Sequence, residues 1–140
     1  MAELMTTPSP SQPHRYVHLP LDRSRQQFRL LKFPQNQIEH AHQIKCEIRT
    51  FDLLSAPAYY ALSYTWGPST PVFRILIDGG FLEIGRNLSE FCKEWCYRAK
   101  EKTEYIWADQ LCINQVDTLE RNHQVELMSR IFSKAITTIV

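Results

Sequence analysis

Apolar and polar residues alternate in short runs along the first half of the chain, and this pattern predicts β-strands. Between 44 and 51, Ile44, Cys46 and Ile48 alternate with polar residues, which is typical of a half-buried strand. A strand over 28–33, which ends before Pro34, is its expected partner. The next strand is expected over 59–65.

A β-hairpin is predicted over 73–84. Two apolar runs, 73–77 and 81–84, flank the turn sequence Asp78-Gly79-Gly80. We expect glycines at two turn positions to supply the positive φ angles of a tight turn.

Helical spacing replaces alternation after residue 86. We expect Asn87 to cap a first helix, with Glu90 three residues on as in a capping box. Its apolar stripe is Leu88, Phe91, Cys92, Trp95, Cys96 and Ala99. Asp117 is expected to cap a second helix with Glu120 at the matching position, and its buried face is expected to be Val125, Met128, Ile131, Phe132 and Ala135.

The order of these elements predicts an α/β fold. A short strand is expected over 105–108, between the two helices, and another over 136–140, after the second helix. From residue 59 the order is therefore strand, hairpin, helix, strand, helix, strand. Strands that alternate with helices favour a parallel sheet with right-handed crossovers. The chain stops inside the last strand, so we expect a truncated, partial or mispredicted gene product.

Polar and aromatic groups follow two of these strands, and they are the candidate ligand-binding residues. In parallel sheets, ligands bind outside the carboxyl ends of the strands. If the two strands are neighbours, both groups lie at one rim of the sheet. The rim residues are Ser63, Tyr64, Trp66 and Gly67 after one strand, and Asp109, Gln110, Asn114 and Gln115 after the other.

Each of these residues also has a structural interpretation. Asp109, Asn114 and Gln115 either bind a ligand or brace the loop, because such side chains often accept or donate bonds within turns. Trp66 is either a pocket wall or a core residue. At the start of the second helix, Asp117, Glu120 and Arg121 form a charged group in which Glu120 suits a capping role beside the helix dipole.

Cysteine and histidine chemistry is weakly supported by the pattern. Cys92 and Cys96 lie on the apolar helix face, which favours a core role. Cys112 with His123 is a conceivable nucleophile–base pair, although nothing in the spacing brings them together. His40, His42 and Cys46 lack a second ligand pair, so we expect no metal site.

The motif-bearing segments resemble the fungal heterokaryon incompatibility (HET) domain family. The family pattern has an A-L-S-Y-x-W-G box, an N-L box, and W-I-D-x-L-C-I-N-Q followed by D-x-x-E-R-x-x-Q-V-x-x-M. The corresponding residues here are 61–67, Asn87-Leu88, 107–115 and 117–128. Ala108 departs from the larger aliphatic residue of the family. The resemblance covers roughly residues 28–140 and implies a signalling module in nonself recognition and programmed cell death.

A weaker resemblance links the same strands to the Toll/interleukin receptor (TIR) fold. Leu62-Ser63-Tyr64 and 106–109 look similar to strand ends of that family. The resemblance implies a flavodoxin-like parallel sheet with flanking helices and an inserted hairpin. It also leaves open an NAD-hydrolysing enzyme whose catalytic glutamate would lie beyond Val140, so NAD is a possible cofactor only by this analogy.

Composition narrows the class of protein without choosing between these functions. The chain has 140 residues, 44% hydrophobic and 22% charged, which suits one globular domain. A formal net charge of +1 gives no electrostatic footprint for nucleic acid. No apolar run is long enough for a membrane span, no secretory signal is visible, and the four cysteines show no disulfide spacing, so we expect a cytoplasmic protein with reduced thiols.

These observations predict the following organisation. Residues 1–27, rich in proline and polar residues, are a disordered lead-in, and residues 28–140 are an incomplete HET domain with its core from about residue 59. Expected partners are other signalling proteins or a second copy. We expect the 140-residue chain alone to be neither fully stable nor active.

Overall fold

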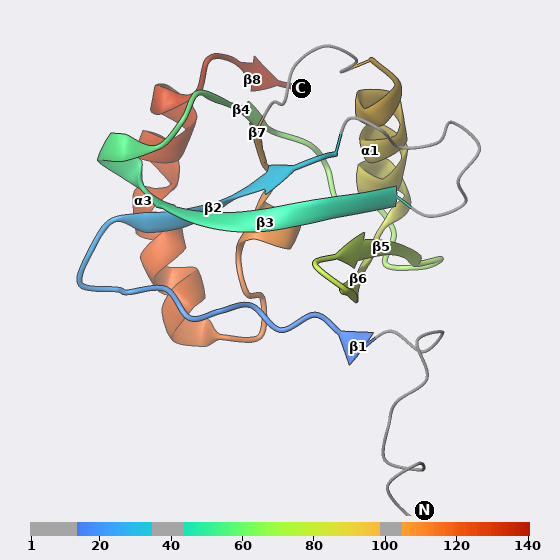
Figure 1. Ribbon diagram of the computed structural model, residues 1–140, viewed down its shortest axis with the longest axis horizontal. Coiled ribbons are helices and arrows are strands. Elements are labelled where there is room, and N and C mark those ends of the chain that lie inside the picture. Colours follow the sequence, from blue (N-terminus) through green and yellow to red (C-terminus); the bar gives the residue numbers. More distant parts are fainter. Residues whose placement is uncertain (1–13, 35–43, 99–104) are drawn as a thin grey trace, which may run out of the picture.

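The computed structural model describes residues 14–34, 44–98 and 105–140, and it shows a mixed α/β fold (Figure 1). In these residues, eight strands form one sheet in the order β1-β6-β5-β3-β2-β7-β4-β8. The strands are β1 His14–Arg15, β2 Gln27–Lys32, β3 Ile44–Asp52, β4 Tyr59–Leu62, β5 Phe73–Ile77, β6 Gly80–Ile84, β7 Tyr105–Trp107 and β8 Thr138–Ile139. The helices are α1 Arg86–Arg98, α2 Asp109–Cys112 and α3 Thr118–Lys134, with a short 3-10 helix over Leu53–Ser55.

The sheet is mixed: the strands predicted to be parallel from residue 59 are parallel, and the strands that precede them add antiparallel pairs. β4 pairs in parallel with β7 and with β8, but β2 is antiparallel to both β3 and β7. The parallel pairs follow from the connections, because α1 and α3 lie in the links that join β4, β7 and β8. The partnership of β2 with β3 is as predicted, and β8 lies at the end of the described strand order.

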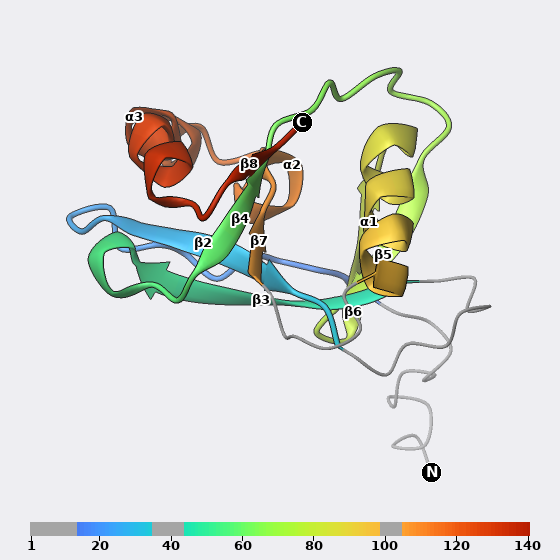
Figure 2. The ribbon, with the colours of Figure 1, turned by 90° about the horizontal axis from the view of Figure 1, so that it is seen from above.

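Helices cover both faces of the parallel strands. Viewed from above, α3 and α1 lie on either side of β4, β7 and β8 (Figure 2). The ring of Trp107 in β7 meets Phe132 of α3 edge-on at 5.2 Å, and Tyr60 in β4 meets Trp95 of α1 at 5.5 Å. Because successive residues of a strand face opposite sides, neighbouring strands can contact both helices.

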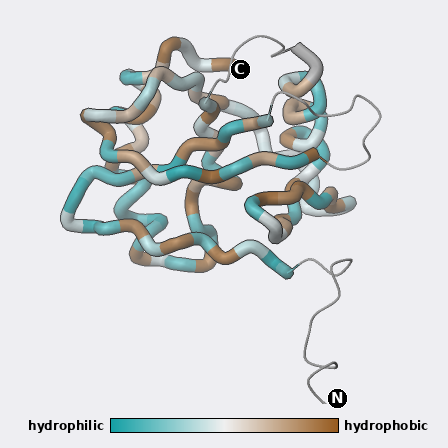
Figure 3. Tube along the Cα trace, in the orientation of Figure 1, coloured by the Kyte–Doolittle hydropathy of each residue, from teal (hydrophilic) through white to brown (hydrophobic). Residues whose placement is uncertain are grey.

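The hydrophobic core lies along the strands, where hydrophobic positions concentrate in Figure 3. Phe28, Leu30 and Leu31 of β2 are all buried, as are Ile106 and Trp107 of β7. A strand that is buried on both faces has no polar side, so its sequence reads as a continuous apolar run. The exception is the residue in the middle of β2, Arg29, which is 1% exposed.

The predicted hairpin is present, although its second glycine has a different role. The turn residues Asp78 and Gly79 have positive φ angles of 47° and 87°, as in a two-residue hairpin loop. Gly80 belongs to β6, and a Cβ atom there would lie 2.8 Å from the carbonyl oxygen of His14. Gly80 therefore permits the close approach of β1 instead of turning the chain.

Residues 16–21 make defined contacts with the rest of the protein, although they fall within the predicted disordered lead-in of residues 1–27. The Tyr16 N–H donates to the Phe81 carbonyl at 2.8 Å, His18 Nε2 bonds the Leu111 carbonyl at 2.8 Å, and Leu21 is buried. Proline and polar composition alone suggested disorder, but the segment is held by the Tyr16 N–H, the His18 ring and the buried Leu21 side chain. Residues 1–13 lie outside the described residues.

Helix α1 begins at Arg86, two residues earlier than a cap at Asn87 predicts, and Asn87 is not its cap. Asn87 lies in the first turn, and its Nδ2 donates to the Thr65 carbonyl at 2.7 Å. The predicted stripe is otherwise partly confirmed, because Leu88 and Cys92 are buried and Phe91, Trp95 and Cys96 are half-buried. Ala99 lies outside the described residues.

Helix α3 has the predicted cap but a different buried face. The Asp117 side chain accepts a bond from the Glu120 N–H at 3.1 Å, which confirms the N-cap. Val125 was expected to be buried but is 61% exposed, and Met128, Phe132 and Ala135 are only half-buried. Ile131 is buried as predicted, and the other buried positions are Glu120, Gln124 and Leu127. The apolar pattern missed this face because two of its four residues are polar and have partners inside the protein.

Arg29 and Glu120 form a buried ion pair that joins β2 to α3. Arg29 Nη1 and Nη2 lie 2.7 and 2.8 Å from the two carboxylate oxygens of Glu120, and the side chains are 1% and 3% exposed. Arg29 also donates to the carbonyls of Cys112 and Leu19, and Glu120 accepts from the Asn114 N–H at 2.6 Å. Such a bidentate pair needs additional hydrogen bonds to offset desolvation, and here both partners have them.

Replacing Glu120 with Gln should destabilise the protein by about 3–5 kcal/mol, because Arg29 would remain charged and buried without its counterion. The Glu126→Gln variant is the matched control, since Glu126 is exposed on the same helix and its loss should cost within about 0.5 kcal/mol. Urea unfolding followed by circular dichroism measures both. Equal shifts of the two midpoints would contradict the structural role of the pair.

Candidate functional site

The two strands that lead to the candidate rim are parallel neighbours. Tyr59 of β4 is paired with Tyr105 of β7, and Ala61 with Trp107. Both strands therefore end at the same edge of the sheet, and the segments that follow them emerge side by side. This is the placement on which the predicted rim depends.

Side chains from the two segments bond to each other at this edge. The Trp66 indole Nε1–H donates to the Asp109 carboxylate, 3.1 Å from Oδ1 and 3.3 Å from Oδ2. The Tyr64 hydroxyl donates to Gln110 Oε1 at 3.0 Å. Four of the predicted rim residues are thus in two direct contacts, while their predicted role in binding a ligand stays a prediction.

Gly67 and Asn87 bring a third segment to the same place. Gly67 has a φ of 76°, and a Cβ atom there would lie 3.0 Å from Nδ2 of Asn87. The same Asn87 Nδ2 donates to the Thr65 carbonyl. Glycine is therefore required at position 67 for its backbone angle and for the close approach of the first turn of α1.

Asn114 and Gln115 brace the loop between α2 and α3. Gln115 Nε2 donates to the Asp109 carbonyl at 2.8 Å, and Asn114 Oδ1 accepts from the Val116 N–H at 3.3 Å. These bonds support the interpretation that both amides brace the loop. Both side chains nevertheless stay partly exposed. Ser63 is exposed, and its backbone N–H donates to the Ile139 carbonyl of β8.

The residues at the start of α3 divide into two kinds. Asp117 and Glu120 are structural: one caps the helix and the other binds Arg29 and the Asn114 N–H. Arg121 is exposed, and its backbone N–H bonds the Asp117 carbonyl.

Sequence reasoning missed Arg29 and His18, both of which contact the rim segments through backbone carbonyls. Arg29 bonds Cys112, and His18 bonds Leu111, so both hold the end of α2. The signal for Arg29 was a single charge inside the apolar run Phe28-Arg29-Leu30-Leu31. A charge in such a run implies a buried partner. His18 gave no comparable signal, because it lies in a polar segment.

Burial shifts the titration of the rim groups. Desolvation raises the pKa of Asp109 above its usual value, while the hydrogen bond from Trp66 opposes that shift. Burial, together with the nearby Asp109 charge, raises the pKa of Tyr64. The Tyr64 hydroxyl is therefore neutral and acts as a hydrogen-bond donor.

The geometry supports neither a Cys112–His123 nucleophile–base pair nor a metal site among the described residues. Burial raises the pKa of Cys112 to about 12, which keeps the thiol protonated, and the His123 ring bonds the Arg25 carbonyl instead. Within residues 14–34, 44–98 and 105–140, no three His, Cys, Asp or Glu side chains are grouped so as to hold a metal ion. His40 and His42 lie outside those residues.

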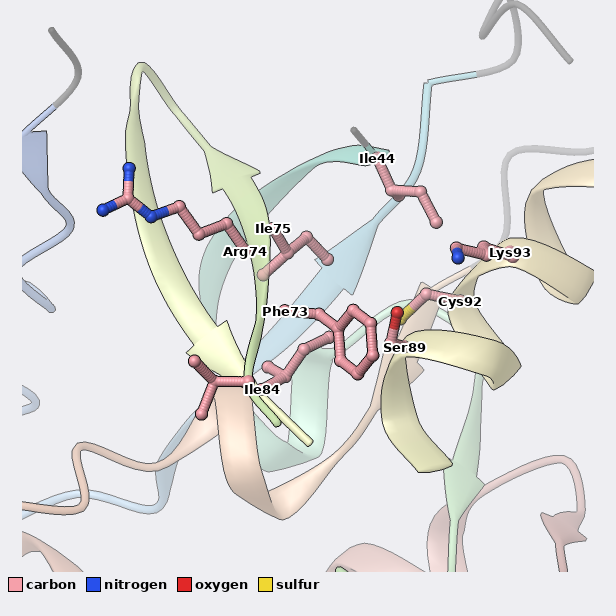
Figure 4. A pocket seen from close by; sticks show the side chains of 9 residues that line it. Ile44, Phe73, Arg74, Ile75, Ile84, Ser89, Cys92 and Lys93 are labelled. Atoms are coloured by element: carbon pink, nitrogen blue, oxygen red, sulfur yellow. The ribbon is translucent and has the colours of Figure 1, made fainter. Parts of the chain in front are cut away.

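Two cavities open near these elements. One of about 340 Å³ lies beside the rim and is lined in part by Trp66, Gln110, Asn114 and Gln115. The other, of about 350 Å³, lies between the hairpin and α1, with Phe73, Ser89 and Cys92 at its wall (Figure 4). Burial raises the pKa of Cys92, so its thiol is also protonated. No predicted rim residue lines the second cavity, so the rim cavity is the stronger candidate.

The Trp66–Asp109 bond should contribute measurably to the stability of the rim. In a double-mutant cycle with Trp66→Phe and Asp109→Asn, we expect a coupling free energy of about 1 kcal/mol, typical of a partly exposed hydrogen bond to a carboxylate. Urea unfolding of the four proteins measures it. A coupling within about 0.3 kcal/mol of zero would mean that the bond does not hold the two segments together.

His18 should make stability fall on mild acidification. Burial lowers the pKa of His18 from 6.5, and its Nε2–H donates to the Leu111 carbonyl. The unfolded chain therefore binds a proton at a higher pH than the native protein, so this contribution to stability is complete above pH 6.5 and is lost as pH falls toward the lowered pKa.

The His18→Gln variant can keep a donor to Leu111 but does not titrate, so it serves as the control. Wild-type stability, measured by urea unfolding at about pH 7.5 and 5.5, should fall more than that of the variant. The same pH dependence in both proteins would show that protonation of His18 does not affect the free energy of unfolding.

Comparisons with known proteins identify the family to which these boxes belong. The family model described as Heterokaryon incompatibility protein (HET) matches residues 59–140. The chain is 35% identical over 112 residues to "Heterokaryon incompatibility protein 6, OR allele" of Neurospora crassa, covering 72% of the chain and 16% of that protein. It is 34% identical over 95 residues to "Vegetative incompatibility protein HET-E-1" of Podospora anserina, covering 64% and 7%.

The chain thus spans a small part of the length of these relatives. No solved structure matches it. In the part of the chain that the structure describes, no helix has the length and apolar character needed to cross a membrane. The model match extends over more than half of the chain and contains every motif segment that meets at the rim, so the chain belongs to the HET family.

Proposed function

We propose that this chain is a signalling module of fungal incompatibility, acting where genetically different hyphae meet and ending in death of the fused cell. The observation that carries the proposal is that three separate HET motif segments contact one another at one rim, through Trp66–Asp109 and Asn87–Thr65. The names of the two relatives, both incompatibility proteins, support the same role.

The state of the rim groups favours recognition over chemistry. Asp109 accepts from Trp66, and the Tyr64 hydroxyl is neutral and donates to Gln110. Both bonds join the segment after β4 to α2, so they fix the conformation of the rim surface. Under this proposal, the partners are other signalling proteins or a second copy of this chain, in the cytoplasm.

The finer fold assignment, a TIR-like or flavodoxin-like domain, is likewise a proposal. The parallel strands β4, β7 and β8 with helices on both faces support it. The antiparallel β2 and β3 depart from it. Hydrolysis of NAD, the alternative activity, has no supporting observation in the described residues and stays a prediction.

Inducible expression in Neurospora crassa of the complete gene product that carries this chain should arrest growth and admit a membrane-impermeant dye to the cells. Asp109→Ala should restore growth at equal protein level, because it removes the acceptor that holds Trp66. Asp52→Ala is the control: it removes a surface ion pair with Arg25, worth at most about 1 kcal/mol, and should leave growth arrest intact.

The proposal fails if the wild-type protein has no effect on growth or dye uptake. It also fails in its assignment of the rim if Asp109→Ala and Asp52→Ala arrest growth to the same degree as the wild type. Immunoblotting of soluble extracts establishes that the variants accumulate equally.

A further inference from the structure

The rim cavity has two walls of different origin. One wall contains Trp66 and the loop residues 113–116, which lie inside the family match of 59–140. The other is formed by residues 15–18 of the N-terminal segment, which precede that match. His18 fixes this segment to α2 through the Leu111 carbonyl, and the Tyr16 N–H fixes it to β6. The cavity therefore exists because the N-terminal segment lies across the family's motif residues.

Apolar side chains are exposed at the cavity on both walls. Val17 is 76% exposed, Val116 is 91% exposed and Trp66 is 41% exposed. Grouped apolar exposure of this kind is typical of a site that binds another molecule, whereas single exposed apolar residues are common on any surface. Trp66 is also held in place by Asp109, so little side-chain freedom is lost when its free surface is covered.

Amide groups supply the polar part of the lining. Gln110 accepts from Tyr64 through Oε1, Asn114 accepts from Val116 through Oδ1, and Gln115 donates to Asp109 through Nε2. Among the described residues, these bonds engage one end of each amide and orient it. The opposite ends, two NH₂ groups and one carbonyl, match the acceptors and donors of a peptide backbone.

The charges at the cavity cancel. Arg15 and Glu83, both of which line it, form an ion pair at 3.2 Å. An occupant with a net charge would meet no unpaired opposite charge in this lining. The volume, about 340 Å³, lies at the lower end of the roughly 300–1,000 Å³ range of ligand pockets, so it suits one side chain and its flanking backbone.

We propose that this cavity binds an uncharged, extended peptide segment of a partner protein, which inserts one apolar side chain between Val17 and Val116 and pairs its backbone with the amides. This inference rests on the proposed function, because it names the partner class of the same rim. It adds that the N-terminal segment, outside the family match, forms one wall of the recognition surface and so contributes to the choice of partner.

Capped amino acids are the smallest probes of this chemistry. Titration of ¹⁵N-labelled protein with N-acetyl-leucinamide should shift the side-chain amide signals of Gln110 and Asn114 and the Trp66 indole signal, with a dissociation constant in the millimolar range expected of so small a ligand, about −4 kcal/mol. N-acetyl-aspartate amide, which adds an uncompensated charge, should produce no such shifts.

Val116→Asp should weaken binding of N-acetyl-leucinamide at least tenfold, because it places a charge at the mouth of the cavity. Leu54→Asp is the matched control: Leu54 is 82% exposed on the 3-10 helix, does not line the rim cavity, and its replacement should leave the titration unchanged. A second variant, Val17→Asp, tests the N-terminal wall in the same way and should also weaken binding. The unperturbed amide spectrum of each variant verifies that it is folded.

Shifts that spread over the surface, or equal binding by wild type, Val116→Asp and Val17→Asp, would overturn the inference. Growth arrest separates it from the proposed function. If Val116→Asp abolishes binding of the probe but the complete gene product still arrests growth, the cavity is not the recognition site although the module still signals. If the wild-type gene product never arrests growth, the proposed function itself fails.

Discussion

The buried ion pair between Arg29 and Glu120 is the interaction on which the arrangement of the site depends. The Arg29 guanidinium joins β2, which carries it, to the end of α2, to the N-terminal segment and to the first turn of α3 through four acceptor atoms. Two charges out of water cost several kcal/mol each, and only this number of short bonds offsets the cost. The pair therefore demands that all four segments occupy their places together, and the loop that carries Asn114 is held by the same carboxylate.

The rim then follows from short-range constraints. With α2 held in place, Asp109 lies where the Trp66 indole can donate to it, and Gly67 allows Asn87 to approach the Thr65 carbonyl. Each contact joins a different motif segment of the HET family. The spacing of these motifs in the chain thus reflects a set of contacts among a strand end, a helix start and a short helix, and a change at one of them is expected to affect its neighbours.

The sequence was sufficient for the elements whose signal is local. Alternation located β3, apolar runs located β2 and the hairpin, and Asp117 marked the start of α3. It was insufficient where a polar residue is buried by a distant partner: the face of α3 was misassigned because Glu120 and Gln124 point inward, toward Arg29 and the Gln27 carbonyl. Asn87 was misassigned for a related reason, since its side chain bonds a carbonyl 22 positions away instead of its own helix.

The position of the candidate site could be predicted from the sequence, but the full set of residues that form it could not. Two strands that end in polar groups indicate a shared edge if they are neighbours, and β4 and β7 are paired. The contribution of residues 15–18 was not predictable, because that segment has no apolar period and is held by the Tyr16 N–H and by His18. Its composition resembles that of a disordered lead-in, although its contacts are with the centre of the site.

The central claim, that the ion pair organises the rim, is tested most directly by hydrogen exchange in a protein without it. The double variant Arg29→Met, Glu120→Leu replaces both charges with apolar groups, a change that buried pairs often tolerate in stability. We expect cooperative unfolding to persist while exchange of the Asn114 amide and the Trp66 indole N–H accelerates at least tenfold relative to amides of β2 and β3. Exchange at Asn114 and Trp66 that matches the wild type in a folded double variant would contradict the account.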